Sequence, residues 1–283
     1  MAQRVASEST ASSARPRLPG WLGRTLSFAG FFLLIALIWE GSKLLFAIPD
    51  YKLPHLLQIA EAFARPTPKG PVALVLLNDV MYTAGEALTG FAIGTVSGFL
   101  MAVLFHHFAP VRRGLLPYVI ASQTVPIIAI APMIVVGLGR AGAPPWLSKS
   151  IIAAYLTFFP VLINVLRGLE SADRDAVALL RSYAATPAQI FFKLRLPASV
   201  PYLFTALKIA ATACVIGAII GELPVGSTNG IGVQLVIGAQ YNTFQPGFLW
   251  ATILVAAGLG IIAYGGVALA ERLLVRWKRP EQE

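Results

Sequence analysis

Residues 200–222 read VPYLFTALKIAATACVIGAIIGE, a stretch in which the only charged side chains are Lys208 and Glu222. A helix of about 20 mainly apolar residues crosses the hydrocarbon layer of a membrane, where only internally hydrogen-bonded backbone is stable. This stretch is therefore expected to form a membrane-spanning helix. Similar stretches predict an all-α integral membrane protein with six transmembrane helices, the others lying at 27–47, 83–105, 115–138, 149–169 and 248–271.

The composition agrees with a membrane protein. Hydrophobic residues make up 57% of the 283 and charged residues only 12%, whereas about 25% is usual for a soluble domain. The net charge of +9 could indicate nucleic-acid binding, but most Lys and Arg residues lie in the two tails and in the loops 106–114 and 167–199. The loop 223–246 has none. The positive-inside rule therefore predicts cytoplasmic termini and explains the charge without nucleic acid.

The chain is expected to be organised around one membrane domain. Residues 1–26 are polar and rich in Ser, Ala and Arg, which predicts a disordered cytoplasmic tail. Residues 27–272 form the expected six-helix domain, with a cytoplasmic loop at 170–199, and residues 273–283 form a second cytoplasmic tail. A cleaved signal peptide is the alternative at the N-terminus. The apolar stretch is long for one and lacks a small-x-small cleavage site, which favours a retained helix.

The loop at 170–199 carries the clearest local signals. Residues 186–189, TPAQ, predict a helix start in which Thr caps, Pro occupies the first turn and Gln returns the hydrogen bond. Asp173 and Asp175 favour an earlier helix start. We expect two short helices with a bend near Ala185, the second ending at Pro197. The pair could lie in the lipid interface or fill a groove in another protein, and the pattern leaves both open.

Residues 178–197 of this loop resemble the "EAA" loop of the membrane subunits of binding-protein-dependent ABC importers, whose pattern is E-A-A-x3-G-x9-I-x-L-P. Leu194, Leu196 and Pro197 fall on the end of the pattern, while Ala178 and Ala184 stand at the acidic and glycine positions. Further segments are similar to the nitrate, sulfonate and taurine-type branch of the family: IASQTVPIIAIAPMIVVGLG at 120–139, IGELPVGSTNGIG at 220–232 and ALAERLLVRW at 268–277.

The resemblance implies an ABC type I importer permease whose loop docks on a cytoplasmic ATP-binding subunit. The residues implied in this coupling are Arg181, Tyr183, Ala184, Ala185, Phe191, Lys193, Leu194, Arg195 and Pro197. A left-handed conformation costs Ala184 about 1 kcal/mol, so we expect the bend to shift toward Thr186. Ala178 removes a possible charge contact with the ATPase.

The same resemblance implies the partners and the cargo. The partners would be the ATP-binding subunit, an extracytoplasmic solute-binding protein, a second permease copy in a homodimer, and membrane lipid of the bacterial inner membrane. The cargo would be a nitrate-, sulfonate- or taurine-like anion, or a heterocyclic vitamin precursor such as a pyrimidine or riboflavin. The GELPVG segment at 221–226 inclines toward the heterocycles. No cofactor or metal is expected on this chain, and ATP hydrolysis is assigned to the separate subunit.

Polar residues within the spans are candidates for the translocation path. Gln123, Thr124 and Pro126 put hydrogen-bonding groups and a kink inside the third span, where a path or only a packing kink could result. Glu222 ends the fifth span and is a candidate for the outer mouth or for contact with a solute-delivery protein.

Three other charges in or beside the spans are interpreted structurally. Glu40 is expected to pair with Lys43, one turn away. Glu86 and Lys208 lie near span ends and are expected to reach lipid headgroups.

Two other functions are considered, an integral membrane enzyme and a passive channel. An integral membrane enzyme would need His, Asp or Glu clustered at one membrane face, and His106 and His107 have no third ligand nearby. A passive channel would transport without ATP. The glycines between Gly221 and Gly232 lack the G-x-x-x-x-G-K-[ST] order of a phosphate-binding loop.

Overall fold

The computed structural model of the chain describes residues 20–224 and 227–275. Most of the two expected tails therefore lies outside the described residues. The first helix nevertheless begins at Gly20, inside the segment expected to be an N-terminal tail, and the last one continues to Leu274.

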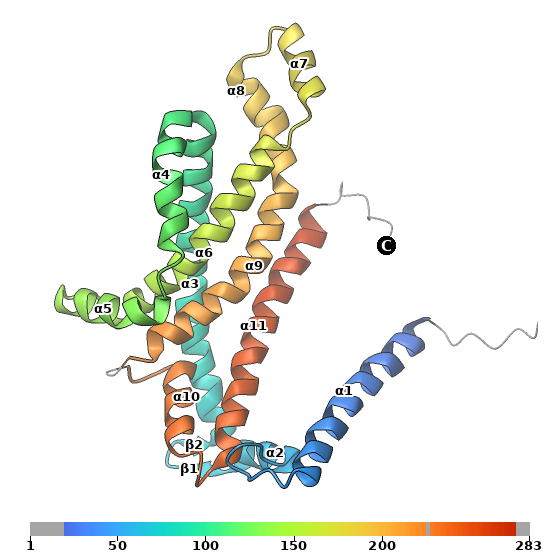
Figure 1. The fold of residues 1–283 in the computed structure, drawn as a ribbon, viewed down its shortest axis with the longest axis vertical. Coiled ribbons are helices and arrows are strands. Elements are labelled where there is room, and N and C mark those ends of the chain that lie inside the picture. Colours follow the sequence, from blue (N-terminus) through green and yellow to red (C-terminus); the bar gives the residue numbers. More distant parts are fainter. Residues whose placement is uncertain (1–19, 225–226, 276–283) are drawn as a thin grey trace, which may run out of the picture. The chain divides into compact units, whose positions relative to one another are not determined.

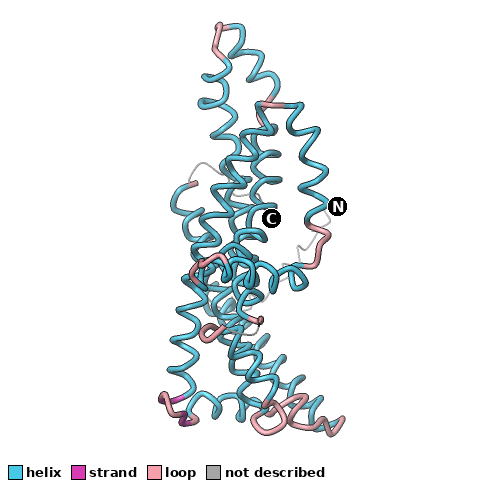
Figure 2. Tube along the Cα trace, turned by 90° about the vertical axis from the view of Figure 1, so that its left-hand side faces the viewer, coloured by secondary structure: helices cyan, strands magenta, loops and turns pink. Residues whose placement is uncertain are grey.

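The described residues are mostly helical (Figures 1 and 2). They form two compact units, divided between Leu56 and Leu57. The first unit contains α1 (Gly20–Leu45), and α2 (Leu56–Ala64) begins at its last residue. The second unit contains the hairpin of β1 (Pro66–Thr67) and β2 (Gly70–Pro71), followed by α3 (Val72–His107), α4 (Ala109–Ser122), α5 (Ile127–Arg140), α6 (Pro145–Glu170), α7 (Arg174–Ser182), α8 (Pro187–Ile190), the π-helix η1 (Phe191–Arg195), α9 (Leu196–Glu222), α10 (Ile231–Gln240) and α11 (Pro246–Leu274).

The expected membrane protein is confirmed, with one span in an altered form. Among the described residues, 5 helices are long and apolar enough to cross a membrane, and a bent pair makes up to 6. That pair is α4 and α5, which meet at 98° instead of forming the continuous third span expected over 115–138. Pro126 immediately precedes α5 in an extended conformation, which a helical path cannot accommodate.

The helix expected to stop at Pro197 continues through it. Residues Pro187–Glu222, which comprise α8, η1 and α9, form one apolar span of 36 residues. The π-turn explains this difference, because its wider i→i+5 hydrogen bonding places the Leu196 N–H on Phe191 O just before the proline. A proline at the start of the following α-helical segment then has no N–H to leave unsatisfied.

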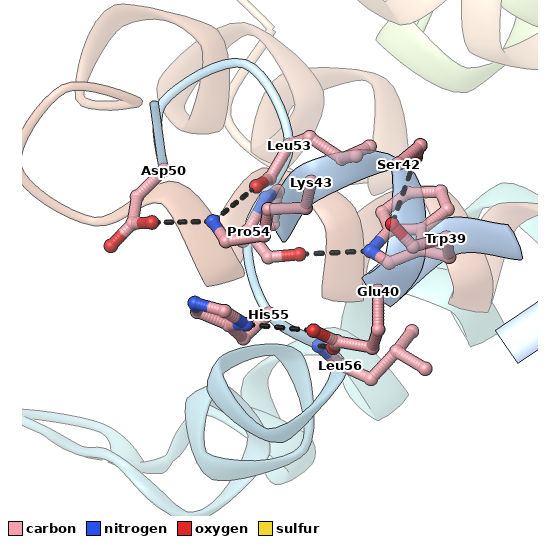
Figure 3. A network of polar contacts seen from close by, with 9 residues as sticks. All are labelled: Trp39, Glu40, Ser42, Lys43, Asp50, Leu53, Pro54, His55 and Leu56. Carbon is pink, nitrogen blue, oxygen red and sulfur yellow. Dashed lines mark hydrogen bonds and ion pairs between the residues drawn. The ribbon is translucent and has the colours of Figure 1, made fainter. Parts of the chain in front are cut away.

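Within the first unit, the end of α1 is tied to the chain that follows it (Figure 3). Lys43 Nζ contacts Asp50 Oδ1 at 2.5 Å and donates to Leu53 O at 2.6 Å. Glu40 instead binds His55 Nδ1 at 2.8 Å and accepts the Leu56 N–H at 2.7 Å. The expected pairing of Glu40 with Lys43 is therefore wrong, since both side chains reach forward to residues 50–56.

The second unit is built on α6, which packs along both α3 and α9. On α3, Gly90, Gly94 and Gly98 face α6 so closely that a Cβ at Gly94 would lie 2.5 Å from Ala154 O. Gly217 of α9 does the same on the other side of α6, where a Cβ would lie 2.6 Å from the Ala153 Cα. Small residues at these positions let helix backbones approach directly, which is how helices pack tightly in lipid.

Candidate functional site

The connection between α6 and α9, residues 171–195, begins with two capped helices. The Asp173 carboxylate accepts the Asp175 N–H at 3.0 Å at the start of α7. At the start of α8, Thr186 Oγ1 accepts the Gln189 N–H at 3.3 Å, and Gln189 Oε1 accepts the Thr186 N–H at 2.8 Å. Both predicted helix starts, including the reciprocal capping box, are confirmed.

The bend between these helices lies at Ala184, not nearer Thr186 as expected. Ala184 has a φ of 57°, whereas Thr186 is extended. The Ala185 N–H donates to Leu180 O at 3.0 Å and the Ala184 N–H donates to Arg181 O at 2.9 Å. These two bonds satisfy the last carbonyls of α7 and require a left-handed residue at 184. The turn therefore keeps its geometry although the residue there is alanine.

The coupling candidates divide by exposure. Tyr183 is 77% exposed, whereas Phe191 is only 8% exposed and its ring lies 4.8 Å from that of His107 and 6.1 Å from that of His106. Phe191 thus anchors the connection to α3 within this chain. Arg181, Ala184, Lys193 and Pro197 are exposed, while Ala185, Leu194 and Arg195 are half-buried. Phe192, which the sequence analysis did not single out, is exposed beside them.

The path candidates Gln123, Thr124 and Pro126 lie together at the break between α4 and α5. Thr124 Oγ1 donates to Ala121 O at 2.7 Å, and the Tyr155 hydroxyl of α6 donates to Ser122 O. The kink expected here is a complete break between two helices that meet at 98°, and α6 is bound to it. Their role in translocation remains a prediction.

Glu222 occupies a buried polar setting instead of an open mouth. Its side chain is 1% exposed; Oε1 accepts from Thr83 Oγ1 at 2.7 Å and Oε2 accepts the Gly232 N–H at 2.6 Å. Thr83 belongs to α3 and Gly232 to the first turn of α10. The carboxylate therefore joins the end of α9 and the start of α10 to α3.

Asp79 and Thr83 complete this attachment of α10 to α3. The Asp79 carboxylate accepts the Gly230 N–H at 3.1 Å and the Gln234 Nε2 amide at 2.6 Å, and Thr83 Oγ1 accepts the Ile231 N–H at 2.9 Å. Gly230 has a φ of 115°, and a Cβ there would lie 2.1 Å from Glu222 Oε1. Only glycine fits both this conformation and this space.

A buried ion pair lies close to Glu222. Glu86 and Lys149 are 3% and 2% exposed, and Lys149 Nζ lies 3.1 Å from Glu86 Oε1 and 5.0 Å from the centre of the Tyr82 ring. Glu86 was expected to reach lipid headgroups, but it is buried and paired with Lys149. Lys208, for which the same was expected, is instead paired with Glu271 Oε2 at 2.8 Å. We refer to Asp79, Thr83, Glu86, Lys149 and Glu222 as the buried polar cluster.

Sequence reasoning missed Asp79, Thr83 and Lys149 as members of this cluster. The available signal was the cost of burying a charge, which requires each charge inside or beside an apolar run to have a partner. Within residues 20–224 and 227–275, the structure contains no group of three or more His, Cys, Asp or Glu that could hold a metal ion. In this arrangement, the carboxylates of Asp79 on α3 and Glu222 on α9 accept backbone N–H groups at the start of α10.

Comparison with known proteins identifies a transport family. Residues 94–276 match the family described as "Binding-protein-dependent transport system inner membrane component". The formylaminopyrimidine transport permease protein ThiX of Halalkalibacterium halodurans is 31% identical, with 89% of this chain and 95% of that protein covered. The riboflavin transport system permease protein RibX of Chloroflexus aurantiacus is 26% identical, with 87% and 88% covered. The putative aliphatic sulfonates transport permease protein SsuC of Bacillus subtilis is 26% identical, with 78% and 81% covered.

Two solved structures share the fold. One is described as an amino acid ABC transporter with histidines; it has a TM-score of 0.59 at 16% identity and covers 72% of this chain and 95% of that one. The other is the MetNI methionine ABC transporter in inward-facing conformations, with a TM-score of 0.57 at 20% identity, covering 74% and 98%.

Replacing Ala184 by Gly should stabilise the connection. A left-handed alanine is strained by about 1 kcal/mol, which glycine removes. We expect slower amide exchange at Ala185 and a higher thermal midpoint. Ala188→Gly, inside α8, is the matched control and should have the opposite effect, since glycine costs about 1 kcal/mol in a helix. Equal effects at both positions would contradict the assignment.

Replacing Glu222 by Ala should release the start of α10. The Gly232 N–H loses its acceptor, at a cost of about 1–3 kcal/mol for a buried group left unsatisfied, whereas the Thr83 hydroxyl can still donate to Asp79 O at 3.0 Å. We expect faster amide exchange over residues 230–234. Glu222→Gln, which keeps an acceptor oxygen at the same length, should have a smaller effect. Unchanged exchange in the Ala variant would show that the carboxylate does not hold the helix.

Proposed function

The chain belongs to the family of binding-protein-dependent transport system inner membrane components, ABC importer permeases of the sulfonate and nitrate type, and on this premise we propose that it is the permease through which an ATP-driven importer moves a small solute. ATP would be hydrolysed by a separate subunit docked on the α6–α9 connection, and the solute would arrive on a binding protein. In this proposal the connection and both termini face the cytoplasm, in keeping with the Lys and Arg distribution.

The observation that supports this proposal is the continuity of one helix. The span Pro187–Glu222 begins in the connection and ends at the buried polar cluster. At 1.5 Å per residue it is roughly 50 Å long, which is more than the hydrocarbon thickness of a membrane. A displacement of the connection by the ATPase would therefore be carried directly to the residues that hold α10.

A second copy of the chain would complete the pathway. Helix α5 has only 14 residues, too few to cross a membrane, and almost all of its side chains are exposed or half-buried. Apolar side chains such as Ile128 and Met133 are exposed on it. A homodimer would place α5, with Gln123 and Thr124 before it, between the two copies. Opening and closing there would give alternating access.

ATP-dependent uptake tests this function. Vesicles with the chain, its cognate ATPase subunit and its binding protein should take up solute with ATP and not with a non-hydrolysable analogue. Tyr183→Asp should reduce ATPase copurification and uptake several-fold. The change replaces the most exposed aromatic side chain of the connection by a charge that docking of the ATPase would remove from water. Tyr241→Asp, on an exposed tyrosine following α10, is the control and should leave ATPase copurification unchanged. Full uptake without the ATPase would refute the proposal.

For the solute, we propose a heterocycle of the pyrimidine or flavin kind rather than a nitrate-, sulfonate- or taurine-like anion. The relatives named for formylaminopyrimidine and riboflavin transport match over most of this chain, and the former at the higher identity of 31%. Thermal-shift screening of the cognate binding protein should show stabilisation by a heterocycle. Stabilisation by an alkanesulfonate or nitrate alone would contradict this choice.

A further inference from the structure

A cavity of about 550 Å³ opens between α7, the end of α6 and η1. Its α7 wall consists of Arg174, Val177, Ala178 and Arg181, which share one helix face because they are three, four and seven residues apart. Val177 is buried and Ala178 is small, so the two arginines flank an apolar floor. Arg195 of η1 lines the same cavity.

The cavity carries uncompensated positive charge. Its carboxylate, Glu170, is already paired with Arg112, which lies outside the cavity. Across the part of the chain that the structure describes, no carboxylate forms an ion pair with Arg174, Arg181 or Arg195. A guanidinium is a cation that presents five N–H donors and no acceptor. A ligand with acceptor oxygens and negative charge would satisfy them.

Arg195 is held in place for such a ligand. Its Nη1 contacts His106 Nε2 at 3.0 Å and Leu169 O at 3.5 Å. A guanidinium can only donate, so His106 Nε2 must be the acceptor and that imidazole is neutral. Both contacts use Nη1, which leaves the Nη2 and Nε donors of the fork for a carboxylate. A planar guanidinium binds the two oxygens of a carboxylate side by side.

The shape favours a protein segment over a free ion. A second cavity of about 290 Å³ shares Arg181 and Arg195 with the first, and its other walls include Pro187, Ile190 and Phe191. Together the two cavities form a surface with positive charge beside an apolar wall. An acidic side chain followed by an apolar one would fill both, whereas a small anion would fill only the charged part.

We propose that this arginine cavity receives an acidic loop of the ATPase subunit, with an Asp or Glu carboxylate bound between Arg181 and Arg195. This inference rests on the proposed function, because it specifies how the ATPase is recognised. The charge on the permease side is positive, and Ala178 adds no acidic group to the wall. The ATPase must therefore supply the acidic group.

The test measures binding of the purified ATPase subunit to the permease in nanodiscs. Arg181→Glu should weaken binding about tenfold or more, and Arg174→Glu should also weaken it, because each opposes the incoming carboxylate. Arg113→Glu is the control: it reverses an exposed arginine of α4 that lies outside both cavities, and should change binding little. Arg195 is left unchanged because it also contacts His106.

A charge exchange identifies the occupant. Lysine placed at one acidic position of the ATPase should restore binding to Arg181→Glu and weaken binding to the wild-type chain. Thermal midpoints matching the wild type would show that the variants are folded, and Arg181→Met provides a second, uncharged replacement.

The outcomes separate the two claims. If the wild-type chain binds the ATPase and Arg174→Glu, Arg181→Glu and Arg181→Met bind equally well, the arginine cavity is not the recognition site, although the proposed function stands. If the wild-type chain does not bind, the proposed function fails too. If inorganic phosphate displaces the ATPase more effectively than chloride at equal ionic strength and no lysine exchange restores binding, the cavity takes a free anion and the inference is overturned.

Discussion

The second unit depends on the direct backbone contact of α6 with the helices on its two sides. Gly90, Gly94 and Gly98 remove the side chains that would separate α3 from α6, and Gly217 does so on α9. In a membrane, moving an apolar side chain from lipid into a helix interface lowers the free energy little, because lipid is equally apolar. Close van der Waals packing must therefore hold the helices together. This close packing fixes the longitudinal register of the three helices. That register places Lys149 beside Glu86 and Glu222 beside Thr83.

The buried polar cluster uses that fixed register to position a helix that does not span the membrane. Helix α10 has 10 residues and is too short to cross alone. The Gly230, Ile231 and Gly232 N–H groups at its start are accepted by Asp79, Thr83 and Glu222. Unsatisfied N–H groups are costly where water is absent, so these three acceptors determine where the short helix can begin.

The sequence was sufficient for features that depend on local chemistry. The lengths of the apolar stretches located the spans. Thr186 and Gln189 identified a helix start, and both hydrogen bonds of the predicted capping box are present. It was insufficient where a partner distant in sequence decides the outcome. Glu222 looked like an exposed end-of-span carboxylate because Thr83 lies 139 residues away. Local spacing likewise suggested the wrong partner for Glu40. At Ala184, the hydrogen bonds of the turn outweighed the steric preference of alanine.

The π-turn at Phe191–Arg195 has a consequence for the directions in which side chains point. An α-helix advances about 100° per residue, and a π-turn accommodates roughly one residue more than an α-turn does. Side chains before and after η1 are therefore rotated relative to the phase that an uninterrupted α-helix would impose. The side chains of α8 and those of α9 therefore follow two different helical phases within one continuous helix. The face that α8 presents to soluble molecules is thus not fixed by the face of α9 that packs against neighbouring helices in the membrane.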